Sequence, residues 1–180
     1  MTRISADWLN GPAQQVCKML ENAGHQAWFV GGCVRNALMG LPVADLDLCT
    51  DAHPTRVMAL AKEAELKAIP TGIDHGTVTV VADGAPFEIT TFRRDVATDG
   101  RRATVAFADT MLEDARRRDF TINALYCDAL GCVVDPLGGL PDLRGASGLL
   151  TTLISASKKT TCASCGSSGF TRGMVTLMVE

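Results

Sequence analysis

The sequence is short of aromatic side chains, of histidine and of long apolar runs. The 3 histidines among 180 residues are scattered without ligand spacing, which disfavours a histidine metal site. No apolar run approaches the roughly 20 residues that cross a bilayer, so we expect no membrane association. The N-terminus lacks a charged segment followed by an apolar one, so we expect no secretory signal. The 7 cysteines are irregularly spaced and odd in number, which favours reduced thiols in a cytoplasmic protein.

A strong excess of one charge is also missing. The net charge of −3 at pH 7 argues against a strongly basic nucleic-acid binder. The arginines are nevertheless concentrated at 93–94, 101–102 and 116–118, and a local basic patch can bind phosphate whatever the net charge. Neither the Rossmann glycine pattern nor the Walker pattern is present, which speaks against those two nucleotide-binding folds.

Apolar periodicity predicts a mixed α/β domain in which helices flank a small sheet. Residues 13–24 space their apolar side chains as in a helix and end at a capping glycine, Gly24. Two β-rich runs on either side of a turn at 82–86 predict a hairpin over 76–92. Further helices are predicted at 34–40, 53–68 and 111–128 and a strand at 45–50. A short strand that enters a glycine turn is predicted at 26–32, a strand and turn at 132–143, and a polar loop at 93–110.

Asp45 and Asp47 stand two residues apart in the predicted strand 45–50. On a strand, residues i and i+2 face the same side, roughly 6–7 Å apart. Like charges on one face repel unless a cation or hydrogen-bond donors intervene, and Mg²⁺ prefers carboxylate oxygens together with substrate phosphates. The pair therefore suits a metal site, although a lone pair of this kind is more often an exposed polar strand edge.

Gly31 and Gly32 follow the strand AWFV and precede the predicted helix that carries Arg35. Glycine lets backbone N–H groups approach phosphate oxygens, and an arginine can hold a phosphate through two parallel hydrogen bonds. A glycine pair is equally compatible with an ordinary tight turn. Glu88 lies on the second hairpin strand, where it can join the two aspartates as a third carboxylate or pair with an arginine.

The segment ARRRDFTINALYCD carries Arg118, Asp119 and Asn123 at positions i, i+1 and i+5. On a helix, such residues can present a guanidinium to a triphosphate and a carboxylate or an amide to a sugar or a base. We expect Phe120, Ile122 and Leu125 to be packing residues. The alternative is a solvated basic helix start capped by the aspartate.

Four motifs occur in order along the chain: GGCVRN, ADLDLCT, FEITTFR and RRRDFTINAL. Over roughly residues 13–144, the set closely resembles the head domain of the class II CCA-adding enzymes and bacterial poly(A) polymerases. The resemblance implies a polymerase-β-like nucleotidyltransferase head at residues 1–144. It also implies Mg²⁺-dependent transfer of CMP or AMP from CTP or ATP to the 3′ end of tRNA. Poly(A) addition and a non-catalytic nucleotide-binding remnant are the alternatives, and no obligate protein partner is expected.

By this resemblance, Asp45 and Asp47 are metal ligands and Glu88 is the third catalytic carboxylate. The nucleotide-binding residues that it implies are Gly31, Gly32, Arg35, Arg118, Asp119 and Asn123. The chain departs from the family at Asn36, where an aspartate is usual, and we expect this change to tune the loop rather than abolish activity. The polar loop 93–110 matches the family's flexible loop and favours the tRNA branch.

Residues 145–180 are rich in Ser, Thr, Gly and Cys and show poor apolar periodicity. The family's helical neck, which pairs with the incoming base, has no counterpart there. Codons permitted for this tail can encode, in a shifted frame, a string with the neck's E-D-x-x-R segment. We therefore expect a frameshift near residues 143–146, a poorly ordered tail and impaired CCA addition. The C-x-x-C at Cys162 and Cys165 lacks a second ligand pair, so we expect no zinc site.

Overall fold

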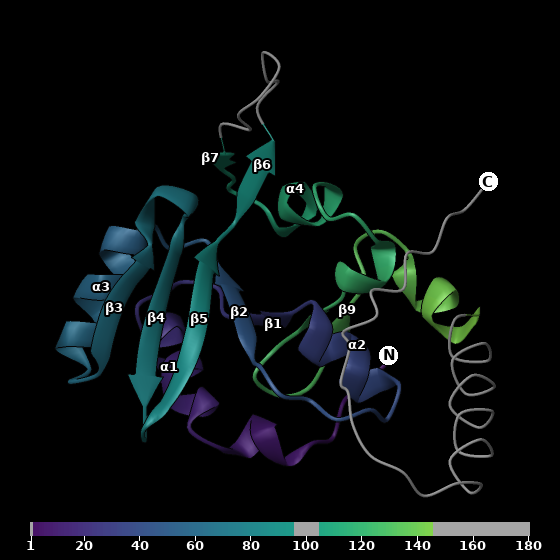
Figure 1. Ribbon diagram of the computed structural model, residues 1–180, viewed down its shortest axis with the longest axis horizontal. Coiled ribbons are helices and arrows are strands. Elements are labelled where there is room, and N and C mark those ends of the chain that lie inside the picture. The colour runs from purple at the N-terminus through teal and green to yellow at the C-terminus, as the bar shows by residue number, and fades with distance from the viewer. Residues whose placement is uncertain (1, 96–104, 146–180) are drawn as a thin grey trace, which may run out of the picture. The chain divides into compact units, whose positions relative to one another are not determined.

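The computed structural model describes residues 2–95 and 105–145 (Figure 1). Their main feature is a mixed sheet in the order β3-β4-β5-β2-β1-β8-β9, in which only the β2–β5 pair is parallel. The strands of this sheet are β1 Trp28–Val30, β2 Asp47–Thr50, β3 Lys67–Gly72, β4 Thr77–Ala82, β5 Ala85–Thr91, β8 Tyr126–Cys127 and β9 Val133–Val134. A separate hairpin pairs β6 Arg93–Asp95 with β7 Val105–Phe107.

Short helices surround the sheet, as the apolar periodicity predicts. The α-helices are α1 Ala13–Asn22, α2 Gly32–Leu38, α3 Pro54–Glu63 and α4 Met111–Arg116, and residues 139–145 are also helical. Single 3₁₀ turns are η1 Asp7–Asn10, η2 Ile73–His75 and η3 Thr121–Asn123. The α/β class with a small mixed sheet and flanking helices is thereby confirmed.

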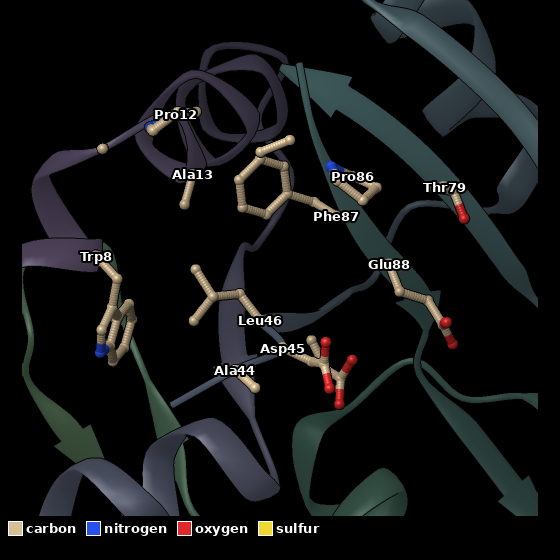
Figure 2. Close-up of a pocket in the computed structure, with 13 residues that line it drawn as sticks. Trp8, Pro12, Ala13, Ala44, Asp45, Leu46, Thr79, Pro86, Phe87 and Glu88 are labelled. Atoms are coloured by element: carbon tan, nitrogen blue, oxygen red, sulfur yellow. The ribbon is translucent and has the colours of Figure 1, made fainter. Parts of the chain in front are cut away.

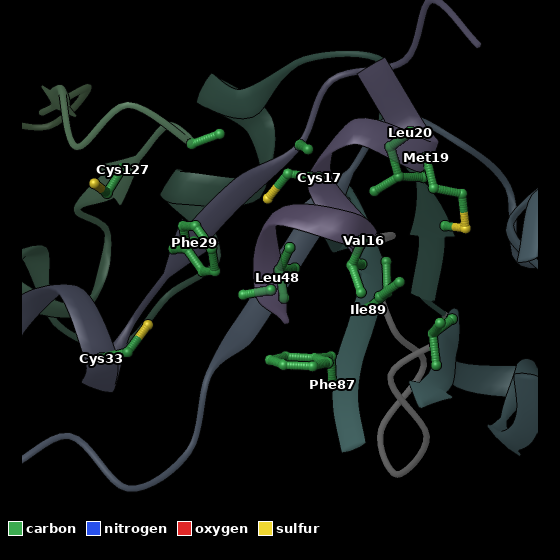
Figure 3. Close-up of a cluster of buried hydrophobic side chains, with 14 of the residues drawn as sticks. Val16, Cys17, Met19, Leu20, Phe29, Cys33, Leu48, Phe87, Ile89 and Cys127 are labelled. Atoms are coloured by element: carbon green, nitrogen blue, oxygen red, sulfur yellow. The ribbon is translucent and has the colours of Figure 1, made fainter. Parts of the chain in front are cut away.

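The main core lies between the sheet and α1. Val16 and Leu20 of α1 are fully buried, and Figure 3 shows Val16 beside Ile89 of β5, with Leu48 of β2 next to them. Burial of such side chains contributes about 1.5–3 kcal/mol each relative to exposure. Because Ile89 faces this core, the alternation of a strand turns its neighbour Glu88 to the opposite face of the sheet.

Helix α1 ends, and helix α3 begins, where the sequence indicates. Gly24 follows α1 with φ +81°, the left-handed conformation that glycine adopts without strain. Pro54 occupies the first turn of α3, after His53 in an extended conformation.

The prediction for residues 53–68 is too long, since α3 ends at Glu63 and 67–72 form the edge strand β3. Leu66 donates its N–H to the Ala61 carbonyl while Glu65 takes a positive φ of 58°, so the backbone leaves the helix there. Most residues of β3 are exposed, so the strand carries no apolar alternation that would reveal it.

The prediction of one helix over 111–128 is also wrong. The helix α4 ends at Arg116, and the chain then passes through η3 into strand β8. Leu125 is fully buried as expected, but Phe120 is 59% exposed and is not a packing residue. The prediction of a polar loop over 93–110 is wrong at 93–95 and 105–107, which pair as the strands β6 and β7. Residues 96–104 of this loop lie outside the described residues, as do 146–180 of the predicted tail. Within the described part, no helix is long and apolar enough to cross a membrane.

Candidate active site

The three acidic side chains singled out in the sequence line one cavity of about 680 Å³. Asp47 begins β2 and is the register partner of Glu88 in the parallel strand β5. The sequence predicted that Asp45 and Asp47 share a strand. This is wrong for Asp45, which lies in the segment before β2. Figure 2 shows Asp45 and Glu88 at the acidic end of this cavity, with apolar side chains at the other.

Negative charge is concentrated at this end of the cavity. Burial raises the pKa of the Asp47 carboxyl, and the neighbouring Glu88 and Asp45 raise it further, while Arg118 acts in the opposite direction. Glu88 forms no ion pair within the described residues, so the alternative that pairs it with an arginine gains no support. Among the residues that the structure describes, the three carboxylates therefore lack the ion-pair partners that buried acidic residues usually have.

The donor set has the chemistry of a Mg²⁺ site, because carboxylate oxygens are the ligands that this hard cation prefers. Accumulated negative charge around Asp47 would also be relieved by a cation. In the part of the chain that the structure describes, however, no group of three Asp, Glu, His or Cys side chains lies close enough together to hold a metal ion.

Two arginines lie over the glycine turn between β1 and α2. Gly31 has φ +76°, and a Cβ atom there would be 3.7 Å from Nη1 of Arg118. A Cβ atom on Gly32 would be 3.7 Å from Nη2 of Arg35. The turn thus needs glycine at position 31 for its backbone conformation, whereas a Cβ atom at position 32 would make only an ordinary van der Waals contact with the second guanidinium.

Arg35 is held by two asparagines, its sequence neighbour Asn36 and the distant Asn123. Its Nη1 donates to Oδ1 of Asn123 at 2.6 Å, and its Nε and Nη2 donate to Oδ1 of Asn36 at 3.1 and 3.0 Å. Asn36 in turn donates from Nδ2 to the carbonyl of Pro42 at 3.1 Å. Asn36 therefore connects the guanidinium of Arg35 to the segment that leads into Asp45.

Arg118 is held by Asp114, a residue that sequence reasoning missed. The Asp114 side chain is 1% exposed and accepts hydrogen bonds from Arg117, from Arg118 and from the Tyr126 hydroxyl. Burial opposes the charge of the Asp114 carboxyl, but Arg118 and Arg117 outweigh it and hold its pKa below the usual range. The spacing of i, i+3 and i+4 in EDARRRD is the signal that could have indicated this network.

The remaining predicted residue, Asp119, is not brought into the site by any contact. Its side chain is exposed, and it forms no hydrogen bond or ion pair with the described residues. Arg118 and Asn123 do reach the glycine turn, but from the segment after α4 and from η3 rather than from one helix.

A mixed sheet with carboxylates on two adjacent parallel strands, beside a glycine turn covered by arginines, defines the head of a nucleotidyltransferase-type fold. The family model described as the poly(A) polymerase head domain matches residues 27–147. The chain belongs to this family.

Curated relatives of the chain are CCA-adding enzymes. The enzyme of Lactobacillus delbrueckii subsp. bulgaricus is 46% identical over 146 residues, which cover 80% of this chain and 36% of the relative. The enzyme of Anoxybacillus flavithermus is 41% identical over 134 residues, or 73% of this chain and 33% of the relative. The chain thus spans about a third of the length of these relatives.

Solved structures similar to this chain include a CCA-adding enzyme and a tRNA nucleotidyltransferase. The Bacillus stearothermophilus CCA-adding enzyme in complex with CTP matches 74% of this chain and 31% of its own, with a TM-score of 0.65 and 41% identity. A tRNA nucleotidyltransferase complexed with a primer tRNA and an incoming ATP analog matches 72% of this chain and 36% of its own, with a TM-score of 0.56 and 29% identity.

Proposed function

We propose that this chain is the catalytic head of a template-independent RNA nucleotidyltransferase that adds CMP and AMP, from CTP and ATP, to the 3′ end of tRNA. The observation that carries the proposal is the placement of Asp47 and Glu88 on paired strands, within the electrostatic influence of Arg118. The names of the curated relatives and the bound CTP and tRNA of related structures support it.

In this proposal, the glycine turn at Gly31–Gly32, with Arg35 and Arg118 over it, binds the triphosphate, and the acidic end of the cavity binds Mg²⁺. Arg35 and Arg118 offset phosphate charge, and the backbone at Gly31–Gly32 approaches the phosphate oxygens closely. Asp45, Asp47 and Glu88 would hold Mg²⁺, which supplies activation of the acceptor hydroxyl and stabilisation of the developing phosphate charge.

The reaction forms a bond between the RNA 3′ oxygen and the α-phosphorus, breaks the bond to pyrophosphate and releases the hydroxyl proton to solvent. The protein contributes mainly by positioning the two reactants and by neutralising charge, because phosphoryl transfer requires little covalent participation by side chains. The fixed guanidiniums of Arg35 and Arg118 suit this role, since their hydrogen bonds to Asn123 and Asp114 orient them before nucleotide binds.

The test is equilibrium binding of CTP and ATP to the 180-residue chain with and without Mg²⁺, beside an assay of nucleotide addition to tRNA that lacks its CCA end. We expect weak, Mg²⁺-dependent binding and slow or no addition, because base selection depends on the neck. Absence of any Mg²⁺-dependent nucleotide binding would overturn the proposal. Addition of AMP from ATP alone to unrelated RNA would favour the poly(A) alternative.

We also propose that residues 1–144 form the head and that a frameshift replaced the neck with residues 145–180. The coding DNA tests this directly, since codons incompatible with the neck-like string would exclude it. A frame-restored chain is expected to add CCA to tRNA, whereas the 180-residue chain is not. Efficient, ordered CCA addition by the 180-residue chain would contradict the proposed need for the neck.

Asn36 offers a prediction about the nucleotide site. Asn36→Ala removes the acceptor for Arg35 and the donor to Pro42, so we expect CTP binding to weaken by roughly tenfold. Asn36→Asp keeps the acceptor for Arg35 but loses the donor to Pro42, and its carboxylate offsets the charge of the Arg35 guanidinium. The affinity of this variant for CTP should therefore fall between those of the wild type and Asn36→Ala. Calorimetric titration with CTP and Mg²⁺ gives this order. Wild-type affinity in Asn36→Ala would show that Asn36 does not position Arg35.

A further inference from the structure

A row of three polar side chains crosses the sheet at the carboxylates. Thr79 of β4 is the antiparallel register partner of Glu88, and Asp47 of β2 is the parallel partner of Glu88 on its other side. Register partners face the same side of a sheet, and in an antiparallel pair their Cβ atoms lie about 4.5–5.5 Å apart. Thr79 also lines the cavity that contains the carboxylates. The row therefore places a hydroxyl on one flank of Glu88 and a second carboxylate on the other.

The Thr79 hydroxyl is itself held by a neighbouring strand. Its Oγ1 lies 2.8 Å from Oγ1 of Thr71 in the edge strand β3, and either hydroxyl can be the donor. An ionised carboxylate only accepts hydrogen bonds, so a bond from Thr79 to Glu88 requires Thr71 to donate to Thr79. Thr71 is exposed, so water satisfies its own oxygen in that arrangement. The pair is thus able to present one hydroxyl proton to the flank of Glu88.

Glu88 needs such a group if it is to hold a cation together with Asp47. The Glu88 side chain is exposed, and Figure 2 shows its carboxylate pointing away from that of Asp45. Within the described part of the chain, the acidic side chains do not converge closely enough to hold a metal ion. Fixing a long side chain such as glutamate costs up to about 2 kcal/mol of rotamer freedom. A hydrogen bond that holds the carboxylate in one orientation offsets part of this cost.

We propose that Thr79 is a positioning residue for Glu88, and that its hydroxyl donates to one carboxylate oxygen while the other faces the cation shared with Asp47. The proposal rests on the proposed function and adds to it the group that orients the third carboxylate. Carboxylates that bind metals are themselves hydrogen-bonded by neighbouring groups, and loss of such a neighbour typically costs about 10–100-fold in metal affinity or activity. Thr79 acts on the cation only through Glu88.

A second pair of hydroxyls on the same face of the sheet provides the matched control. Thr77 and Thr90 are register partners, and their Oγ1 atoms lie 3.1 Å apart. Each stands two residues from a member of the row, so both share its face. Neither of these two described residues lines the cavity of the carboxylates. A hydroxyl pair that only stabilises the sheet should contribute about 0.5–1.5 kcal/mol at either place, whereas only Thr79 has a carboxylate as its register partner.

The experiment measures the free Mg²⁺ concentration that half-saturates binding of fluorescently labelled CTP to the 180-residue chain, which requires no turnover. Thr79→Val keeps the shape of the side chain and loses the hydroxyl, so this concentration should rise by roughly tenfold. Thr79→Ser restores the hydroxyl and should return it to within about twofold of wild type. Thr77→Val should leave it within about twofold of wild type. Without Mg²⁺, the two valine variants should melt within about 5 °C of one another, because each loses one threonine pair.

The outcomes separate this role from the proposed function. An unchanged Mg²⁺ requirement in Thr79→Val, or an equal rise in Thr77→Val, would overturn the proposal while Mg²⁺-dependent CTP binding by the wild type leaves the proposed function standing. Failure of Thr79→Ser to restore the requirement would overturn it as well, since the hydroxyl would then not be the acting group. If the wild-type chain binds no CTP with Mg²⁺, the proposed function itself fails, and the inference fails with it.

Discussion

Replacing Asp47 by asparagine is expected to lower nucleotidyl transfer by about 10³-fold, because losing a metal carboxylate forfeits several kcal/mol of transition-state stabilisation. Asparagine keeps the shape of the side chain at the start of β2, so the parallel pairing with Glu88 should persist. Single-turnover transfer of labelled CMP to tRNA measures the effect in the frame-restored chain. In the 180-residue chain, the corresponding effect is loss of Mg²⁺-dependent CTP binding.

The stability of the same variant distinguishes a catalytic carboxylate from a structural one. Glu88 and Asp45 repel the Asp47 charge, so its removal should leave the melting temperature without Mg²⁺ unchanged or higher. Asp74→Asn, in the exposed turn η2, is the matched control and should retain transfer. A variant that transfers CMP normally, or that unfolds at a clearly lower temperature, would support the non-catalytic remnant instead.

The sequence was sufficient for the residues whose position follows from local rules. The alternation along β5 turns Glu88 away from the core that holds Ile89. The parallel pairing of β2 with β5, which places Asp47 beside Glu88, is by contrast a tertiary contact. The contact of Arg35 with Asn123 could not be predicted from spacing, because 88 residues separate the two in sequence. Only the packing of η3 against α2 brings them together.

Asp114 was missed for a different reason. In sequence, an acidic residue followed by arginines at i+3 and i+4 resembles a solvated helix face, which contributes little to stability. The deciding fact is that Tyr126, from strand β8, closes over the carboxylate and removes it from solvent. A tertiary contact thus converts an apparently ordinary surface pair into a buried network that fixes Arg118.

Asp114→Ala is accordingly expected to destabilise the head by about 3–5 kcal/mol, since it leaves buried charges of Arg117 and Arg118 without their partner. This is a large part of the roughly 5–15 kcal/mol that stabilises a typical domain. Urea denaturation at pH 7 measures the loss. Asp109→Ala, on the exposed turn before α4, should change stability by less than about 0.5 kcal/mol. Equal stability of Asp114→Ala and wild type would show that the network does not hold the fold together.

The pH dependence of Asp114→Asn tests the charge of this network separately from its packing. Arg118 and Arg117 depress the pKa of Asp114 below its ordinary value of 3.8 despite burial, which would raise it. A carboxyl with a depressed pKa in the folded state contributes stability above its unfolded pKa and loses it as the pH falls through the folded value. The wild type and Asp114→Asn should therefore differ most at neutral pH and begin to converge only below about pH 4, as the pH falls toward the depressed folded pKa of Asp114, because asparagine resembles the protonated acid. A difference that stays constant from pH 7 to strong acid would assign the stability to the shape of the side chain rather than to its charge.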